Sequence, residues 1–518
     1  MSALLSVIYT LRRYHRAVRE VGMEADDSVH GTSLSLLTDL YQLTMSQGYL
    51  AAGRGEDRAV FHLFFRKLPF GGGFAIAAGM EPALEWLKAA RFDESDVAYL
   101  ASLRAADGSA LFAPVFLERL RGFRFGIDVD MVAEGTAVFP HEPLVRVEGP
   151  LWHCQLAETA LLTIINFQTL IATKAARMVH AAAGDPVIEF GLRRAQGIDG
   201  GLSATRAAFV GGVAATSNVL AGKLLGVPVR GTHAHSWVMA FEDELESFRA
   251  YAKAMPNNCL LLVDTFDTLR GVRNAVIVGG ELEAAGHRLL GIRLDSGDLA
   301  YLSIEARKIL DAAGLNDASI VASNDLDERT ILSLKHQGAK IDTWGVGTRL
   351  VTGGDQSALG GVYKLAAIRT NEREAWRSTI KLSDHVAKVS IPGRLDIGRC
   401  WRDGRMVGDA IVRADEALAG GSTIVDADDP TREKRLEGDR FEMLLEPRLR
   451  GGEVVGQGPA RLIEARQRAI AQRAALHPGV LRFDSPHQYP AGIEQSLAAE
   501  RLEMVRAARQ RAALGAQA

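Results

Sequence analysis

Six short runs rich in Val, Ile and Leu each end in polar residues that could do chemistry. Arginine side chains, Gly-rich backbone N–H groups and Thr hydroxyls suit phosphate oxygens, whereas the carboxylates of Asp295 and Asp325 suit ribose hydroxyls or a magnesium ion. Together these residue types favour a phosphorylated sugar as substrate. The ends of the runs carry Arg193 and Arg194; Thr232, His233 and His235; Asp264 and Thr265; Arg293, Asp295, Ser296 and Asp298; Asn324 and Asp325; and Gly345, Gly347 and Thr348.

Helix capping is the competing interpretation of these polar residues. Asp298 and Asp325 precede apolar helical patterns, where Ser, Thr, Asp and Asn commonly cap the first turn. The Gly-x-Gly pattern at 345–347 would also suit a tight turn. Arg and His are not capping residues, so capping does not explain the charged and imidazole side chains after the first two runs.

The segment GTHAHSW at 231–237 carries two histidines that are two residues apart. On an extended backbone His233 and His235 point to the same side. They could form a metal-ligand pair, but no third His or Cys lies nearby in the sequence. A hydrogen-bonded structural histidine is the alternative for His233. For His235 we favour a nucleophile or base that is oriented by Asp264.

The segment from about 186 to 367 supplies the elements that must gather these residues. Its apolar runs recur with strand centres roughly 25 to 40 residues apart, which is the length of a βα unit. Near-continuous apolar strands that alternate with helices indicate a parallel sheet covered on both faces, either an α/β barrel or a doubly wound sheet. In both folds the side chains at the carboxyl ends of the strands meet on one face.

The flanking segments predict a different organisation. Residues 31–150 combine a helix at about 39–51 with strand-like stretches, and residues 368–450 alternate charged residues with short strands and turns, which suggests an antiparallel sheet. Both flanks could form one domain around the central unit. The predicted units are an N-terminal extension at 1–30, the first part of a sheet-rich domain at 31–150, an α/β catalytic domain at 151–367, the second part of the sheet-rich domain at 368–450 and a helical tail at 451–518.

Composition excludes several classes of protein. The 518 residues include 60 Lys and Arg against 63 Asp and Glu, so the chain has no basic field for nucleic acid, and 47% hydrophobic residues exclude general disorder. No apolar stretch approaches the roughly 18 residues of a membrane helix. Cys154, Cys259 and Cys400 lack the spacing of a disulfide framework or a zinc site, which favours a cytoplasmic location. At the N-terminus, an organellar transit segment and a later start at Met23 are open alternatives.

Several longer motifs follow one another in collinear order over roughly residues 34–370. They are LLTDLYQLTM at 36–45, FRKLPFGGGFAIAAG at 65–79, EFGLRRAQGIDGGLSATRAAFVGG at 189–212, TSNVLAGKLLGVPVRGTHAHSWV at 216–238, LLVDTFDT at 261–268, IRLDSGDL at 292–299, ASNDLDE at 322–328 and GVGTRLVTGG at 345–354. No single motif is specific, but the set closely resembles the nicotinate phosphoribosyltransferase family.

The resemblance implies a type II phosphoribosyltransferase fold, in which an irregular α/β barrel stands beside a sheet-rich α+β sandwich domain made from both chain ends. It also implies that nicotinate attacks C1 of phosphoribosyl pyrophosphate, giving nicotinate mononucleotide and pyrophosphate in the first step of NAD synthesis from nicotinate. ATP would be a co-substrate, hydrolysed through a phosphohistidine, and Mg2+ a cofactor whose ligands are not assigned. Active sites shared between subunits would make the enzyme a homodimer.

Carried over by position, the resemblance also implies roles for individual residues. His235 would be the phosphorylated residue, Asp264 its carboxylate partner, and Arg293 the third catalytic residue. The binding residues would be Thr232 and Arg293 at the nicotinate carboxylate, Arg193 against base and phosphate, Asp295 at the ribose hydroxyls, Asn324, Asp325, Gly347 and Thr348 around the ribose and 5′-phosphate, and Tyr41 of a neighbouring subunit stacked on the pyridine ring. By pattern alone, Tyr41 would instead be a core residue of an amphipathic helix.

Ser217 bears on the choice of pyridine. The related nicotinamide-using enzymes have an acid in the segment that matches ATSNVLAG at 215–222, and an acid would repel nicotinate. Ser217 therefore favours nicotinate and is expected to lie against it. Two alternatives stay open: a relative of the same fold that acts on nicotinamide or quinolinate, and a catalytically silent scaffold or ligand sensor.

Overall fold

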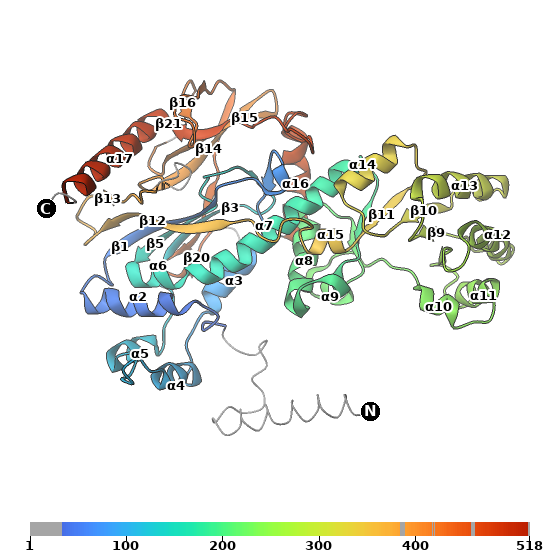
Figure 1. Ribbon diagram of the computed structural model, residues 1–518, viewed down its shortest axis with the longest axis horizontal. Helices are drawn as coiled ribbons and strands as arrows, with labels where there is room; N and C mark the ends of the chain where they lie inside the picture. The colour runs from blue at the N-terminus through green and yellow to red at the C-terminus, as the bar shows by residue number, and fades with distance from the viewer. Residues whose placement is uncertain (1–33, 384–388, 417, 419, 457–460, 516–518) are drawn as a thin grey trace.

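The computed structural model describes residues 34–383, 389–416, 418, 420–456 and 461–515. The predicted N-terminal extension at 1–30, with the alternative start at Met23, lies outside the described residues. Figure 1 shows an antiparallel and a mixed sheet on one side of the molecule and helices around a parallel sheet on the other. Helix α7 (Glu158–Ala181) runs between the two parts.

The parallel sheet is built from βα units, as the spacing of the apolar runs predicted. Its six strands pair in the order β7-β6-β11-β10-β9-β8. The strands are β6 (Val187–Glu189), β7 (Ala215–Thr216), β8 (Leu260–Leu262), β9 (Gly291–Leu294), β10 (Ser319–Ala322) and β11 (Thr343–Val346). The helices of this part are η2 (Leu192–Arg194), α8 (Gly197–Gly211), α9 (Val219–Leu225), α10 (His235–Met239), α11 (Glu244–Ala254), α12 (Thr268–Ala284), α13 (Leu299–Ala312), α14 (Glu328–His336) and α15 (Thr348–Val351).

The two edge strands of the parallel sheet are joined by the segment 228–232, where the sequence predicted a strand. Thr216 in β7 exchanges backbone hydrogen bonds of 2.9 Å with residues 228 and 230. At the other edge, the Thr232 hydroxyl donates to the carbonyl of Leu260 in β8 at 2.6 Å. The expected α/β class is confirmed. The edges are connected only through this segment, because β7 and β8 do not pair with each other in the described part of the chain.

A seven-stranded antiparallel sheet takes its strands from both sides of the parallel unit in the sequence. In order across the sheet they are β13 (Arg377–Ser378), β12 (Gly361–Arg369), β1 (Arg58–Phe65), β5 (Val145–Pro150), β3 (Asp128–Val132), β19 (Leu445–Arg450) and β20 (Glu453–Val454). The helices before the parallel unit are α2 (Leu40–Ala51), η1 (Pro69–Gly71), α3 (Met80–Ala89), α4 (Glu94–Ser102), α5 (Pro114–Leu120) and α6 (Leu151–Leu156). Because β19 pairs directly with β3, the two flanks of the sequence share one sheet and one hydrophobic core. Strand β12, which pairs with β1 in this sheet, lies almost wholly in the segment 151–367 that the sequence assigned to the catalytic domain.

A second sheet of six strands follows the parallel unit in the sequence. Its order is β17 (Glu433–Arg435), β16 (Thr423–Val425), β21 (Ala491–Glu494), β15 (Arg405–Arg413), β14 (Leu395–Arg402) and β18 (Arg440–Met443). The short strands β2 (Ala75–Ile76) and β4 (Ala137–Val138) form a separate pair. Two helices, α16 (Leu462–Ala475) and α17 (Gln495–Gly515), come from the segment predicted as a helical tail, and α16 packs against α8.

Helix α7 ties the parallel unit to the rest of the molecule. Lys174 Nζ lies 2.7 Å from Glu328 Oε2 at the start of α14, and Arg177 Nε donates to Glu328 Oε1 at 2.8 Å. Because a buried charge is costly without a partner, these contacts fix the start of α14 against α7. The three cysteines are free and buried. Within the ranges that the structure describes, no helix is both long and apolar enough to cross a membrane.

Candidate active site

Side chains that follow β8, β9 and β10 form one hydrogen-bonded network. Asp264 Oδ2 accepts from the Asp295 N–H at 2.8 Å and from the Ser296 hydroxyl at 2.7 Å. Arg293 donates from Nε to Ser323 Oγ at 2.7 Å and from Nη2 to Asp295 Oδ1 at 2.8 Å. The Ser323 hydroxyl also donates to Asp295. The network therefore holds the Arg293 guanidinium in one orientation.

Asp295 is the charged centre of this network. Burial acts to raise the pKa of Asp295, but hydrogen bonds from Ser323 and Arg293, together with the charge of Arg293 and of His235, outweigh burial and lower the pKa below its ordinary value. The side chain keeps 24% of its surface exposed. The carboxylate is thus ionised at neutral pH and can accept hydrogen bonds from a ligand.

His235 begins α10 and lies beside the network. Its Nδ1 is 3.1 Å from Thr265 Oγ1, and its Nε2 is 3.7 Å from Asp295 Oδ2. The side chain is 40% exposed, so the ring is open to a ligand. Asp264, its predicted partner, accepts instead from residues 295 and 296, and in the described residues its buried Oδ1 has no hydrogen-bond partner. The pairing of His235 with Asp264 stays a prediction.

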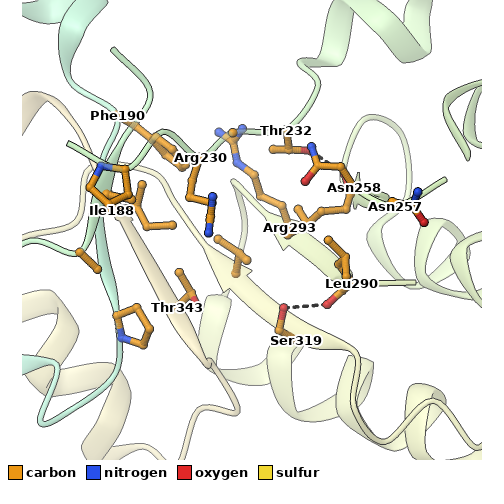
Figure 2. A pocket seen from close by; sticks show the side chains of 17 residues that line it. Ile188, Phe190, Arg230, Thr232, Asn257, Asn258, Leu290, Arg293, Ser319 and Thr343 are labelled. Atoms are coloured by element: carbon orange, nitrogen blue, oxygen red, sulfur yellow. Dashed lines mark hydrogen bonds between the residues drawn. The ribbon is translucent and has the colours of Figure 1, made fainter. Parts of the chain in front are cut away.

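A cavity of about 690 Å³ lies along the parallel strands, and its lining extends from their amino ends, at Asn257, Leu290 and Thr343, to Arg293 near the carboxyl end of β9 (Figure 2). Asp264, Asp295 and His235 do not line it. Thr232 and Arg293, both predicted to meet a carboxylate, line it together with Phe190 and Arg230. The Arg293 guanidinium carbon lies 5.6 Å from the centroid of the Phe190 ring, within the range of a cation–π contact. Sequence reasoning missed Phe190 and Arg230. The period of two along β6, which brings Ile188 to the same cavity, is the signal that could have found Phe190.

His233 has a structural role. Its Nε2 accepts from the Leu262 N–H at 3.1 Å, and its Nδ1 lies 3.3 Å from the Ala234 carbonyl. Because Nε2 accepts, the proton of the neutral ring is on Nδ1. Burial lowers the pKa of His233. The structural interpretation is confirmed, and no group of three or more His, Cys, Asp or Glu side chains in the described residues could hold a metal ion.

Arg193 and Ser217 lie after β6 and β7, respectively. Arg193 is exposed on η2, and the N–H of the half-buried Ser217 donates to the Glu189 carbonyl at 2.9 Å. The Glu189 carboxylate is fully buried and accepts from the Thr216 hydroxyl at 2.6 Å and from the Thr205 hydroxyl at 3.0 Å. Sequence reasoning also missed Glu189, which fixes the backbone on which both predicted residues stand.

Asn324 and Asp325 occupy exposed positions after β10. Asn324 has a φ of 101°, a left-handed conformation that costs energy in a residue other than glycine and is enriched at functional sites. The cap of α14 is Asp327, which accepts from the Thr330 N–H at 2.8 Å, so the capping interpretation of Asp325 is wrong. Asp298 does cap α13, as expected. Freed from capping, the Asp325 carboxylate is available to a ligand.

Gly347 and Thr348 form the turn from β11 into α15. Gly347 is the N-cap residue of this helix and Thr348 its first residue. A Cβ added at Gly347 would meet no atom nearer than 3.5 Å, so one side of this turn is open to a ligand. The contact of these residues with phosphate stays a prediction.

Tyr41 lies on α2, in the part of the molecule away from the parallel sheet (Figure 1). Its side chain is 46% exposed, so the interpretation as a core residue is wrong. Partial burial and the nearby Glu158 raise the pKa of Tyr41 to about 12, which keeps the hydroxyl protonated. An exposed aromatic ring is suited to contact with another molecule. Contact of a Tyr41 ring with a ligand at the parallel sheet would therefore require Tyr41 of a second subunit.

Three family models match successive parts of the chain. The N-terminal domain of nicotinate phosphoribosyltransferase matches residues 36–166, the nicotinate phosphoribosyltransferase family matches residues 186–390, and the C-terminal domain of nicotinate phosphoribosyltransferase matches residues 399–500.

Proteins named nicotinate phosphoribosyltransferase are similar to this chain over most of their length. A nicotinate phosphoribosyltransferase of Bacillus subtilis is 49% identical over 370 residues, covering 71% of this chain and 73% of the relative. One from Mycobacterium tuberculosis is 40% identical over 469 residues, covering 90% and 93%. The crystal structure of human nicotinic acid phosphoribosyltransferase, 33% identical, superposes with a TM-score of 0.77 over 90% of this chain and 99% of that one.

Proposed function

Because the chain belongs to the nicotinate phosphoribosyltransferase family, we propose that the site at the carboxyl ends of its parallel strands transfers a phosphoribosyl group to nicotinate. The enzyme forms nicotinate mononucleotide and pyrophosphate from nicotinate and phosphoribosyl pyrophosphate, which is the first step of NAD synthesis from nicotinate.

The observation that carries the proposed site is the fixed guanidinium of Arg293 inside the 690 Å³ cavity. Nicotinate is a flat aromatic ring with one carboxylate. The Phe190 ring offers a face for the pyridine, and the Arg293 guanidinium offers donors for the carboxylate. Because Ser323 and Asp295 already hold Arg293, binding costs little further ordering of this side chain.

The reaction chemistry fits a site that positions rather than deprotonates. The pyridine nitrogen has no proton to lose, so the main requirement is to hold it in line with C1 of the ribose. Cleavage of the C1–O bond builds positive charge on the ribose and negative charge on the leaving pyrophosphate. In the proposal the ionised Asp295 binds the ribose hydroxyls beside the developing positive charge. Arg193 and the backbone donors at Gly347 and Thr348 contact phosphate.

ATP enters the proposal through His235. A ring nitrogen of His235 attacks the γ-phosphorus of ATP, and the bond from that phosphorus to the bridging oxygen of ADP breaks. The support is that the ring is 40% exposed and that Thr265 and Asp295 orient its two nitrogens. The phosphoryl group would add negative charge and hydrogen-bond acceptors beside the substrates. Attack of water on this phosphorus would then break the N–P bond and release phosphate, which completes ATP hydrolysis and couples it to the transfer.

Magnesium fits this site as an ion carried by the substrate phosphates. Mg2+ usually keeps several waters and binds through one or two carboxylates plus phosphates. Asp264 supplies an unpartnered buried oxygen, Oδ1, and Asp295, whose backbone N–H donates to Asp264, supplies a second carboxylate. When bound, the ion would stabilise the charge that develops on pyrophosphate. We propose these acids as the residues that hold it.

Two further parts of the proposal concern the whole protein. Tyr41 is exposed on a helix away from the cavity, which supports its supply by the second subunit of a homodimer. Free buried cysteines support a reducing, cytoplasmic environment.

A competition of pyridines tests the proposed function. Purified protein with phosphoribosyl pyrophosphate, Mg2+ and ATP receives ring-deuterated nicotinate, nicotinamide and unlabelled quinolinate at equal concentrations, and mass spectrometry scores the products. We expect deuterated nicotinate mononucleotide to dominate. Unlabelled nicotinate mononucleotide, formed from quinolinate with loss of CO2, would identify quinolinate as the substrate. The variant Ser217→Asp should lower the preference for nicotinate over nicotinamide by about tenfold or more, because an acid repels the carboxylate and accepts from an amide N–H. Dominance of another mononucleotide in the wild type would refute the assigned substrate, and absence of every product would leave a silent scaffold.

A further inference from the structure

A second cavity, of about 420 Å³, lies on the sheet that contains β14, β15 and β17, and it shares no lining residue with the cavity of the proposed active site. We call it the basic groove, because its lining includes Arg402, Arg405, Lys434, Arg435 and two histidines, His477 and His487. Only one acid, Glu437, lines it. Nothing in the proposed transfer reaction uses these residues.

Two of the cations stand at exposed positions opposite each other in a hairpin. Arg402 ends β14, Arg405 begins β15, and the two are direct partners in the antiparallel register. The turn between them is Asp403-Gly404, with φ values of 50° and 72°, the positive values that a tight two-residue hairpin requires. Like charges directly opposite each other destabilise a strand pair. An anion that binds between the two guanidinium groups would remove that repulsion.

No carboxylate neutralises three of the cations within the part of the chain that the structure describes. Arg402 donates to the backbone carbonyl of Glu437 at 2.9 Å, and Lys434 Nζ donates to the carbonyl of Val407 at 3.3 Å. Neither contact carries a counter-charge, and Arg405 has no ion pair there. Burial and the charge of Arg402 lower the pKa of Lys434, as expected for a cation that lacks an anion. By contrast, Arg435 lies 3.6 Å from Glu437.

The two histidines are positioned by Gly479. His477 Nδ1 accepts from the Gly479 N–H at 3.0 Å, so the proton of the neutral ring is on Nε2 and that nitrogen is a donor. The His487 N–H donates to the Gly479 carbonyl at 2.8 Å, and the two ring centroids are 6.0 Å apart. A Cβ added at Gly479 would come within 3.0 Å of His477 and 3.1 Å of His487. Glycine therefore permits the close approach of both rings beside the cations.

We infer that the basic groove binds a small polyphosphate, either free or as part of a nucleotide, at a place separate from the proposed active site. Several guanidinium and ammonium groups around a concave surface suit adjacent phosphates, because each forms charge-assisted hydrogen bonds with phosphate oxygens. A volume of about 420 Å³ is within the range of small-molecule sites. The inference goes beyond the proposed transfer reaction and does not depend on it.

Hydrogen–deuterium exchange of the full chain tests the groove locally. The probes are inorganic tripolyphosphate and, in a separate arm, ATP, and exchange is compared in peptides covering 400–407, 432–437 and 477–490. We expect protection of these peptides with tripolyphosphate, independent of any protection around 293–298 and 345–354. Stronger protection by ATP would assign a nucleotide, and equal protection would assign the phosphate chain alone. No protection in the groove peptides with either probe would overturn the inference.

Variants separate groove binding from binding elsewhere. Arg402→Gln combined with Arg405→Gln and Lys434→Gln should raise the tripolyphosphate concentration that gives half-maximal protection by about tenfold or more, since charge-assisted hydrogen bonds are lost. The single variant Arg405→Gln gives a smaller loss and serves if the triple variant does not fold. The control is Arg440→Gln, an exposed arginine that pairs with Glu442 outside the groove. Equal binding by the triple variant and the control would contradict the site.

Discussion

The guanidinium of Arg293 is oriented before any substrate arrives. Its hydrogen bonds to Ser323 and Asp295, at 2.7 and 2.8 Å, leave the rest of the planar group facing the cavity beside Phe190. Preorganised charge is effective in catalysis and binding because it does not have to reorganise when the ligand enters. The same network keeps Asp295 ionised, so one set of hydrogen bonds serves both a carboxylate-binding and a ribose-binding residue.

His235 yields a prediction at the scale of one residue. The variant His235→Ala should lose incorporation of the γ-phosphate of ATP into the protein, because the attacking ring nitrogen is gone. Radiolabelled ATP followed by gel analysis under mildly alkaline conditions, which preserve phosphohistidine, measures this. His336→Ala removes an exposed imidazole at the end of α14 and is the matched control. Labelling that persists in His235→Ala would exclude the assigned role.

At this scale the sequence predicted which residues gather, but not all of their partners. The strand-end rule selected Asp264, Arg293 and Asp295, and these do share one network. The contacts of His235 with Thr265 and Asp295 depend on where the first turn of α10 lies relative to β8 and β9, and no local sequence pattern encodes that position. Ser323 was not predicted, because its contact with Arg293 arises from the pairing of β10 with β9, two strands that a helix separates in the sequence.

The βα units position the site, and their strands were predictable because buried parallel strands are continuous apolar runs. The runs at 186–191, 259–265, 289–298, 318–325 and 340–348 contain β6, β8, β9, β10 and β11. The run at 227–232 is instead an irregular segment. The edge strand at this end is β7, whose two residues, Ala215 and Thr216, are too few for a periodic signal.

The loop after β10 gives a prediction at the scale of an element. Asp327→Ala should destabilise the protein by about 0.5–2 kcal/mol, because it removes the side-chain cap of α14. Urea unfolding followed by circular dichroism measures the free energy of unfolding. Asp311→Ala, which removes only an exposed ion pair with Arg307 in α13, should cost less. Equal losses of unfolding free energy in the two variants would show that the Asp327 cap stabilises the protein no more than this ion pair does.

The arrangement of the whole chain could be predicted only in part. Antiparallel strands were expected in both flanks, and the pairing of β3 with β19 unites them across the intervening parallel unit. The place of β21 between β16 and β15 was not expected, because the last segment of the sequence is dominated by helical Arg/Ala-rich patterns. Strand pairing between distant segments is set by the packing of the whole molecule and leaves little trace in local sequence.

His62 links two sheets and predicts how stability depends on pH. Its Nε2 accepts from the N–H of Leu395 at 3.2 Å, and burial together with Arg146 and Arg394 lowers the pKa of His62 to about 3. Because the pKa in the unfolded chain is about 6.5, the unfolded chain takes up the proton first as the pH falls. Stability should therefore decrease from about pH 6.5 towards pH 3, by about 2 kcal/mol between pH 7 and pH 5 from this group.

Urea unfolding at pH 7 and pH 5 checks the role of His62. The variant His62→Gln lacks the titrating ring, so its stability should fall less between the two pH values than that of the wild type. His336→Gln, at an exposed position, should behave as the wild type. A loss in His62→Gln as large as in the wild type would assign the acid sensitivity to other groups.

Shared active sites predict complementation between two defective chains. Tyr41→Ala and Arg293→Ala should each be poorly active alone. If Tyr41 of one subunit completes the site that contains Arg293 of the other, a mixed dimer regains one intact site. Equal mixing with subunit exchange should then restore about one quarter of wild-type activity, since half of the dimers are mixed and half of their sites are intact. No gain above the separate variants would show that the two residues do not meet across subunits.

The central claim is that the cavity beside Arg293 binds nicotinate for phosphoribosyl transfer, and the specificity constant for nicotinate tests it most directly. Formation of nicotinate mononucleotide is measured for the wild type, for Arg293→Ala and for Arg249→Ala, which removes an exposed ion pair with Glu281 on the protein surface. The account predicts product formation by the wild type and by Arg249→Ala. It predicts a kcat/KM about 10- to 100-fold lower in Arg293→Ala, for loss of the charge-assisted hydrogen bonds to the carboxylate. Equal values in all three proteins, or no product from the wild type, would contradict it.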